Sequence, residues 1–380
     1  LEFRRVLFRS GEELVESVID VAKAWFNEAK ARIDVNYALG PFVYHNRTFL
    51  PDELFGKLTE LRVSRPDAIN EAAAVRVKRG RLAGEDGKLL VLAADHPARR
   101  VTGVGPEPYA MADRQEYLGR IARVMTSPWC DGLMGTPDVI EEALLLDLLV
   151  REKTGKGFLD SKILIGSMNR SGLLGAEFEM KDMITAYDAE WIERMGLAGG
   201  KVLLRLDLES RYSIRTMMTL APEIKKLQLK GFPIFIEPLP VRRTSHGYET
   251  VMEPGELARM AGVAAALGGT TATSWLKLPY VEEFDLVAQS TTLPILLLGG
   301  AALENPLKTV ESFEKGLGIA SNIRGAMVGR NVLFPGYDDP RAVSKAIWGL
   351  IHEGWGSERA VRELAAERGV EQEFLSSILL

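Results

Sequence analysis

Cysteine and histidine are scarce in this sequence, and their scarcity limits the chemistry that the chain can carry. Among 380 residues there are one cysteine and four histidines. The single cysteine, Cys130, excludes a disulfide framework within the chain and fits a reducing compartment, so we expect a cytoplasmic protein. No His-x-His or His-Glu-x-x-His spacing occurs. The sequence therefore shows no recognised signature of a metal site.

Charge and long apolar runs are also missing in forms that would indicate particular partners. The net charge is −5 at pH 7, which gives no electrostatic reason to expect binding to nucleic acid or to an anionic membrane. No apolar run approaches the ~18 residues that suggest a membrane span. Residues 1–10 are basic and apolar, but no long apolar core and no cleavage site follow them. We interpret 1–10 as a truncated or non-native leader.

What the chain does contain is hydrophobic residues, 46% of the total, gathered into short runs from residue 89 onward. The runs are rich in Val, Ile, Leu and Ala and are nearly continuous, as expected of parallel strands that are covered on both faces. The eight runs lie at 89–94, 132–134, 163–165, 202–206, 233–236, 272–278, 294–298 and 325–328.

Amphipathic segments alternate with these runs, and their apolar residues recur at helical spacing. This alternation predicts a (β/α)8 TIM barrel at about residues 85–350. An open, doubly wound sheet is the alternative, but no Gly-rich dinucleotide-binding turn follows the first run. The predicted helices lie at 114–124, 139–153, 186–195, 215–230, 254–267 and 308–316.

Helices are also predicted on both sides of the barrel. Residues 11–84 are predicted to form an N-terminal helical extension, with helices at 12–33 and 66–77. We interpret the basic run 76–81 as a solvated face. A helix at 341–352 is predicted to close the barrel, and residues 351–380 are predicted to form a C-terminal helical extension. Its segments 357–368 and 371–379 are candidates for contact in a homo-oligomer.

Charged residues stand where three of the predicted strands end, which is where barrel enzymes carry their chemistry. Asp95 follows the first run, Glu237 the fifth, and Lys277 lies within the sixth. Burial is expected to lower the pKa of Lys277 and to raise that of Glu237. A neutral lysine beside a carboxylate can attack a carbonyl group. The alternative is that Lys277 sits at a strand end and reaches water along its aliphatic stem.

A second group of strand-end residues indicates a substrate or phosphate site. Gly299 and Gly300 follow the seventh run, and Gly329 and Arg330 follow the eighth. Bare backbone N–H groups and a guanidinium at these two ends can hold a phosphate. Further candidates for substrate contact at strand ends are His96, Asn169, Arg205 and Asp207.

The order of these motifs resembles that of the class I (Schiff-base) aldolase superfamily. That superfamily includes deoxyribose-phosphate, archaeal-type fructose-bisphosphate and tagatose-bisphosphate aldolases, and the arrangement is most similar to the last of these. The resemblance covers roughly residues 89–339. The motifs that carry it are Phe235-Ile236-Glu237-Pro238-Leu239, Leu276-Lys277-Leu278-Pro279, Leu298-Gly299-Gly300 and Val328-Gly329-Arg330.

The resemblance implies a role for several of these residues. Lys277 would be the Schiff-base lysine and Glu237 the proton shuttle. Asp95 would orient hydroxyl groups or assist proton transfer, while Gly300 and Arg330 would contact a phosphate. The implied ligand is a small-molecule sugar phosphate, and no cofactor is expected.

The sequence departs from the resemblance in two places. Leu278 follows Lys277, where the deoxyribose-phosphate branch has threonine. The only lysine of the fourth run, Lys201, stands at the start of the strand, so a supporting lysine deep in the site is not expected.

Two other functions remain open at this stage. A metal-dependent barrel lyase or isomerase would use Asp95, His96, Glu237 and His246 as ligands, although their spacing matches no recognised motif. A non-catalytic barrel that binds a sugar phosphate would keep Arg330 and the glycines, but it has no use for Lys277 beside Glu237.

Overall fold

The structure is a computed structural model of the chain, and it describes residues 20, 23–24, 42–245, 247–300 and 305–380. The predicted leader at 1–10 lies outside the described residues. The predicted helix at 12–33 lies outside them as well, apart from three positions.

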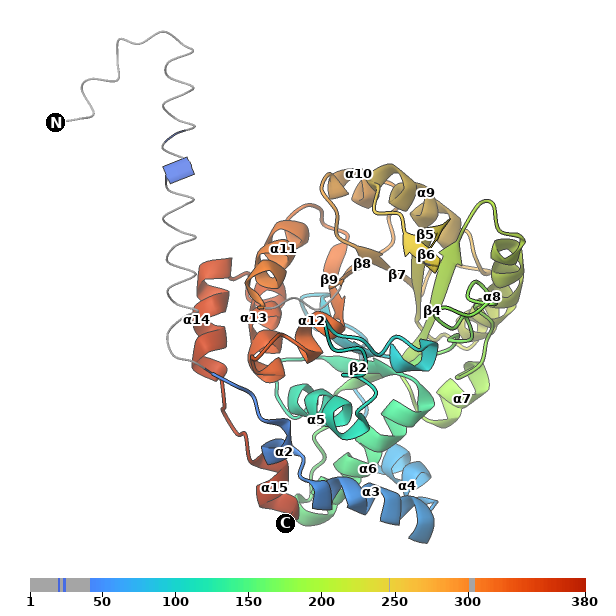
Figure 1. The fold of residues 1–380 in the computed structure, drawn as a ribbon. Coiled ribbons are helices and arrows are strands. Elements are labelled where there is room, and N and C mark those ends of the chain that lie inside the picture. Colours follow the sequence, from blue (N-terminus) through green and yellow to red (C-terminus); the bar gives the residue numbers. More distant parts are fainter. Residues whose placement is uncertain (1–19, 21–22, 25–41, 246, 301–304) are drawn as a thin grey trace, which may run out of the picture.

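The chain folds into a closed parallel barrel, as the alternation of strands and helices predicts (Figure 1). The strands pair in the order β4-β3-β2-β1-β9-β8-β7-β5, and a further pairing of β4 with β5 closes the ring. Each of the eight predicted runs overlaps one strand of this ring. The strands are β1 (Leu89–Ala94), β2 (Gly132–Gly135), β3 (Ile163–Ser167), β4 (Gly199–Leu206), β5 (Ile234–Thr244), β7 (Ser274–Pro279), β8 (Ile295–Leu298) and β9 (Ile323–Val328).

Alternate side chains along each strand face the barrel interior and the surrounding helices in turn. Leu89, Val91 and Ala93 of β1 belong to the interior cluster, whereas Leu90 and Leu92 belong to the larger cluster between sheet and helices. The same two-residue period continues beyond the apolar part of a strand. Polar side chains at the next interior-facing positions therefore project into the barrel near the carboxyl ends of the strands.

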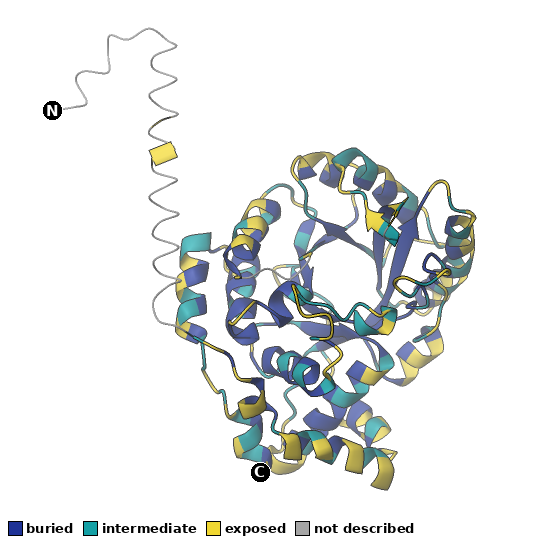
Figure 2. Cartoon of the chain, viewed as in Figure 1, coloured by how far each residue is buried: buried dark blue, intermediate teal, exposed yellow. Residues whose placement is uncertain are grey.

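Helices cover the outside of the sheet, so the strands are buried and the outer helix faces are exposed (Figure 2). No helix in the described part of the chain is long and apolar enough to cross a membrane. The surrounding helices are α5 (Arg114–Met125), α6 (Pro137–Thr154), α7 (Ala189–Arg194), α8 (Arg211–Leu229), α9 (Pro254–Ala265), α10 (Phe284–Gln289), α11 (Leu307–Leu317) and α13 (Pro340–His352).

Helices from both ends of the chain pack together on one side of the barrel (Figure 1). Helices α2 (Asn46–Phe49), α3 (Asp52–Ser64) and α4 (Ala68–Val75) contact α5 or α6, and α15 (Phe374–Leu379) contacts α2 and α6. Helix α14 (Ser357–Glu367) packs on α13 and α11. A buried ion pair joins Arg123 of α5 to Asp339, and Arg123 also donates to the carbonyls of Val370 and Glu371.

The segment before β1 closes the N-terminal end of the barrel. Leu82 and Ala83 pack against the interior cluster. Arg76 is buried and donates hydrogen bonds to the carbonyls of Lys162 and Gly196, and Arg79 pairs with Asp131. The interpretation of 76–81 as a solvated face is therefore wrong for these two arginines, because the turns before β3 and β4 and Asp131 before β2 offer them acceptors. Because this end is closed, the opening of the barrel lies at the carboxyl ends of the strands.

Strand β5 is longer than the sequence predicts, because it continues into a hairpin. It pairs antiparallel with β6 (Gly247–Thr250), with Val241 opposite Thr250. Pro238 and Pro240 interrupt the apolar run and hide this extension from sequence analysis. The hairpin carries Thr250 and Met252 to the mouth of the barrel.

We predict that Arg123→Leu lowers the free energy of unfolding by ~3–5 kcal/mol, because it leaves the Asp339 carboxylate buried without its cation. Urea denaturation followed by circular dichroism measures the change. Arg362→Leu is the control, since Arg362 forms an exposed pair with Glu358, and we expect a change below ~0.5 kcal/mol. Equal losses in the two variants would contradict the assigned importance of the buried pair.

Candidate active site

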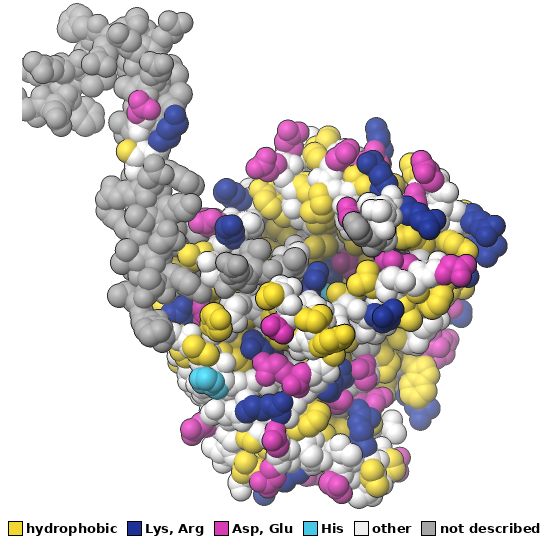
Figure 3. Space-filling model, in the orientation of Figure 1, with side chains coloured by type: hydrophobic (Ala, Val, Ile, Leu, Met, Phe, Trp, Pro, Cys, Tyr) yellow, Lys and Arg dark blue, Asp and Glu magenta, His cyan; other side chains and the backbone are white. Residues whose placement is uncertain are grey.

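A cavity of about 370 Å³ opens at the carboxyl ends of the strands. In the space-filling view of this face, basic side chains lie inside the hollow above the barrel (Figure 3). Lys277 and Glu237 line the cavity together with predicted substrate-binding residues. The predicted residues among its walls are His96, Glu237, Lys277, Gly299, Gly300, Gly329 and Arg330.

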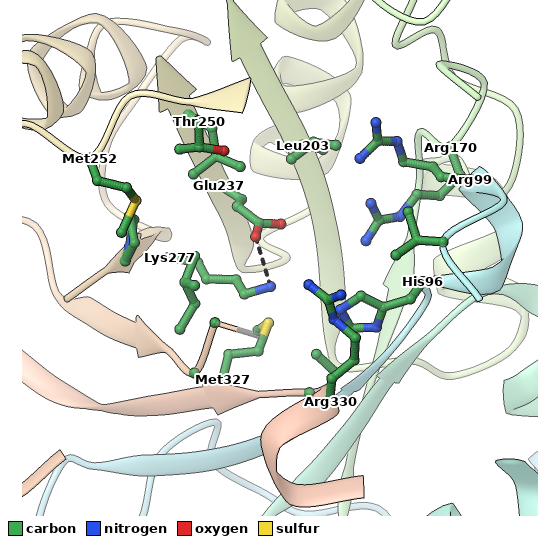
Figure 4. Close-up of a pocket in the computed structure, with 18 residues that line it drawn as sticks. His96, Arg99, Arg170, Leu203, Glu237, Thr250, Met252, Lys277, Met327 and Arg330 are labelled. Atoms are coloured by element: carbon green, nitrogen blue, oxygen red, sulfur yellow. Dashed lines mark ion pairs between the residues drawn. The ribbon is translucent and has the colours of Figure 1, made fainter. Parts of the chain in front are cut away.

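Lys277 and Glu237 form a buried pair at the centre of this site (Figure 4). Their strands are neighbours, and Ile236 of β5 lies opposite Leu276 of β7, so the next residues along both strands face the interior side by side. The Lys277 Nζ is 3.0 Å from the Glu237 Oε1, and both residues are less than 10% exposed. The side-chain amine is held against a carboxylate and does not extend into bulk water.

Lys201 is a second lysine on the same carboxylate. It is fully buried, forms an ion pair with the Glu237 Oε2, and lies 3.5 Å from Asp95. The expectation that no supporting lysine lies deep in the site is therefore wrong. Strand β4 begins at Gly199, and Lys201 faces the interior two positions before Leu203, which pairs with Glu237.

Asp95 is fully buried next to the cavity, where it anchors two cations. Its Oδ2 accepts hydrogen bonds from the Ser167 Oγ and the Arg170 Nε, each at 2.8 Å, and lies close to Lys201. Its Oδ1 is buried and has no hydrogen-bond partner among the described residues. Asp95 does not line the cavity, so we assign it a positioning role. Its predicted part in proton transfer stays a prediction.

Charges of opposite sign thus alternate through the site in the order Arg170, Asp95, Lys201, Glu237 and Lys277. Burial alone would raise the pKa of Glu237, but the cations Lys201, Lys277 and Arg170 outweigh it and hold that pKa far below its ordinary value. The expectation that the barrel mouth raises the pKa of this carboxyl group is therefore wrong. Glu237 is therefore ionised at physiological pH.

Burial lowers the pKa of two other groups in the site. It lowers the pKa of Lys201 to about 8, and the nearby Arg170 contributes in the same direction. It also lowers the pKa of His96 to about 3, so its imidazole is neutral at physiological pH. The site therefore holds a lysine that titrates near neutrality and a histidine that carries no charge.

The glycines after β8 and β9 serve two purposes. Gly300 has φ +71°, a left-handed conformation that favours glycine. Gly299 and Gly329 are instead required by packing. The Asn331 side chain occupies the place of a Cβ at position 299, and the His96 ring lies 2.6 Å from that of a Cβ at position 329.

Arg330 points into the cavity without a carboxylate partner among the described residues. Its Nε is buried and has no hydrogen-bond partner there, and burial is the one cause that lowers its pKa. A guanidinium left uncompensated at a cavity wall is suited to an anionic ligand.

Three predicted substrate contacts are not among the residues that line the cavity. Asn169 exchanges hydrogen bonds with the backbone of Leu203, and Arg205 pairs with Asp182. Asp207 accepts from the backbone N–H of Glu209. These contacts give all three side chains a structural part in the loops around β4.

The cavity also has walls that the sequence analysis missed. Arg99 and Arg170 follow β1 and β3 closely, so the rule that sites lie at strand ends could have included them. Thr250 and Met252 come from the hairpin and carried no sequence signal. No group of three His, Cys, Asp or Glu side chains suited to a metal ion occurs in the part of the chain that the structure describes, and His246 lies outside that part.

We predict a pH effect on stability that depends on Lys201. Because its pKa is about 8 in the folded protein and 10.5 ordinarily, the unfolded chain binds more protons between these values. Stability should therefore rise with pH across this interval in the wild type. Urea denaturation from pH 7 to 11 should show that the rise is smaller in Lys201→Met. Lys153→Met, at an exposed position of α6, controls for the loss of a lysine. Parallel profiles for wild type and Lys201→Met would refute the assignment.

No curated protein matches the chain, but solved structures do. Two fructose-bisphosphate aldolases share the fold at low identity. One is a Schiff base forming fructose-1,6-bisphosphate aldolase, 20% identical with a TM-score of 0.50, over 75% of this chain and 100% of that one. The other, from Slackia heliotrinireducens, is 15% identical with a TM-score of 0.53, over 84% and 94%.

A higher similarity is found with the crystal structure of Cgl0159 from Corynebacterium glutamicum. That chain is 35% identical with a TM-score of 0.74, and the match covers 83% of this chain and 100% of that one. Residues 87–347 also match the Cgl0159-like family profile. The chain therefore belongs to the Cgl0159-like family.

Proposed function

We propose that this protein is a class I aldolase that cleaves or forms a carbon–carbon bond in a sugar phosphate, or in a related keto or aldehyde sugar, through a Schiff base on Lys277. The observation that carries the proposal is the buried Lys277–Glu237 pair at the wall of an open cavity. Buried lysines are costly to a fold. A barrel that only bound a sugar phosphate would have no use for two of them on one carboxylate.

The arrangement supports the first half of such a reaction. The Glu237 Oε1 lies 3.0 Å from the Lys277 Nζ, which is within hydrogen-bond reach of the proton that must leave the ammonium group. The nitrogen lone pair then forms a bond to the substrate carbonyl carbon. The carbonyl oxygen takes one proton from this nitrogen and one from the protonated Glu237 and departs as water, which leaves an iminium ion.

The second half of the reaction uses the same two groups. As the bond between the α and β carbons breaks, its electron pair becomes the carbon–carbon double bond of an enamine, and the electron pair of the C=N bond moves onto the Lys277 nitrogen. A base must remove the hydroxyl proton of the departing aldehyde, and Glu237 is placed to move protons at this point. Lys201 and Asp95 do not line the cavity. They act through Glu237, because they fix its position and its charge.

An anionic end of the substrate would be held by Arg330 and the Gly299–Gly300 turn. A smaller cavity of about 130 Å³ adjoins this turn and is lined by Gly299, Gly300, Lys308 and Thr309. Lys308 and Thr309 belong to the first turn of α11, where backbone N–H groups and the helix dipole favour an anion. These features support a phosphate-binding role for this side of the site.

The two fructose-bisphosphate aldolases described above share this fold at 20% identity or lower. They show that the same barrel architecture serves aldolase chemistry elsewhere. A cytoplasmic location and assembly into a homo-oligomer stay predictions from the sequence.

The decisive test is covalent trapping. Wild-type protein is mixed with ketose or aldose phosphates and reduced with sodium borohydride, and its intact mass is measured. We expect the added mass of one reduced substrate per chain on the peptide that contains Lys277. Lys277→Met should fold, because methionine keeps the volume, and should lose both the label and the cleavage activity.

Two controls sharpen this experiment. In Lys201→Met any remaining label should still map to Lys277, since Lys201 is placed to hold Glu237. EDTA should leave trapping and cleavage unchanged, whereas loss of activity on chelation would favour a metal-dependent lyase. A label that maps to Lys201, or activity that survives in Lys277→Met, would overturn the proposal.

Glu237→Gln should lower kcat by about 10²–10⁴, the usual contribution of a general acid–base. Glutamine keeps the shape of the side chain but cannot accept the proton from Lys277. Steady-state kinetics with a substrate identified by the trapping experiment measure the effect, and circular dichroism checks that the variant is folded. An unchanged kcat in a folded variant would remove Glu237 from the mechanism.

A further inference from the structure

Two arginines line the side of the cavity away from the Gly299–Gly300 turn, and Arg330 lies between the two sides, because it follows β9, the neighbour of β1. Arg170 follows β3, and in the order of strands around the barrel β3 stands diametrically opposite β8, which Gly299 and Gly300 follow. Arg99 follows β1 and leans toward Arg170, because its Nε donates to the carbonyl of Gly172 in the loop after β3. Figure 4 shows the two guanidinium groups together, across the cavity from Lys277 and Met252.

Both guanidinium groups keep donors that the described residues do not use. A guanidinium has five N–H donors. Arg170 directs its Nε and one Nη toward Asp95. Arg99 gives its Nε to Gly172 and has one Nη 4.0 Å from Glu179. The remaining N–H groups are available to a ligand in the cavity that both residues line.

The charges on the cavity wall do not balance. Among the described residues, four lysine and arginine side chains line it, namely Arg99, Arg170, Lys277 and Arg330, against one carboxylate, that of Glu237. Behind the wall, Asp95 pairs with Arg170, and Glu179 lies 4.0 Å from Arg99. The Glu237 carboxylate already pairs with Lys201 and Lys277. Burial lowers the pKa of Arg99 to about 10, and the nearby cations Arg205 and Arg170 act in the same direction. A bound anion would relieve this excess of positive charge.

The rest of the wall offers little to hydroxyl groups. Among the described residues of the cavity wall, Thr250 and the neutral His96 have the only uncharged side chains that are able to form ordinary hydrogen bonds with a ligand. Leucine, methionine, proline, valine and alanine make up most of the remaining side chains. A sugar-phosphate chain in this cavity would therefore be held mainly by the charged groups at its ends.

We propose that the substrate carries a second anionic group, a carboxylate or a phosphate, at the end opposite the Gly299–Gly300 turn, and that Arg99 and Arg170 bind this group. The orientation rests on the proposed function, which places the first anionic group at Arg330 and that turn. Lys277 then meets a carbonyl group between two fixed charges. Arg170 has a double part, since it binds the ligand and also holds Asp95.

Three matched probes test this by isothermal titration calorimetry at fixed ionic strength. Glucitol 6-phosphate has one anionic end, 6-phosphogluconate adds a carboxylate at the other end, and glucitol 1,6-bisphosphate adds a phosphate there. None has a ketone or aldehyde group, so none can form a Schiff base with Lys277. We expect at least one doubly anionic probe to bind tenfold or more tightly than glucitol 6-phosphate. The probe that is preferred identifies the group as a carboxylate or a phosphate.

The preference should disappear in Arg99→Met and fall in Arg170→Lys, which keeps a cation near Asp95 but loses the guanidinium geometry. Arg100→Met is the control, because Arg100 is exposed and does not line the cavity, and it should keep the preference. Equal affinity for all three probes, no measurable binding of any, or a preference that survives in both Arg99→Met and Arg170→Lys would each overturn the proposal.

The outcome is independent of the trapping experiment. A borohydride label on Lys277 without a preference for doubly anionic probes would leave the aldolase proposal standing and remove the second anion site. A preference for doubly anionic probes without a label would support the second anion site and remove the aldolase proposal.

Discussion

The Glu237 carboxylate, shared by two buried lysines, is the interaction on which this site depends. Alone, each buried ammonium group would lose most of its hydration at a large cost in free energy. Lys201 and Lys277 stabilise the anionic form of Glu237. In the same way, Asp95 stabilises the cationic forms of Lys201 and Arg170. Removal of one member would leave a buried charge unpaired, so the five groups form one electrostatic unit. That unit connects five parts of the barrel, from the end of β3 through β1, β4 and β5 to β7.

Much of this arrangement follows from the period of a strand. In β1 the interior-facing positions run Leu89, Val91, Ala93, and the next one is Asp95. Sequence analysis could therefore name Asp95, Glu237 and Lys277, since each continues or interrupts an apolar run whose phase is readable. The barrel itself was predictable for the same reason, because doubly covered strands leave continuous runs of apolar residues.

The features that could not be predicted from the sequence depend on pairing between distant segments. Lys201 was predicted to stand at the start of a strand, because Gly199 and Gly200 weaken the strand signal. In the structure, β4 begins at Gly199 and pairs there with β3 and β5. The hairpin was hidden by two prolines. The sign of the pKa shift at Glu237 was missed for the same reason, since it depends on Lys201, thirty-six positions earlier in the chain.

The closed floor under the barrel has a consequence for the order of events. Leu82 and Ala83 block the amino ends of the strands, so whatever enters the cavity must also leave by the mouth. In the proposed reaction, the fragment bound to Lys277 stays attached to the wall while the other fragment is already free. Because the covalent bond to Lys277 still has to be hydrolysed, the proposed reaction predicts ordered product release through the mouth, with the imine-forming fragment last.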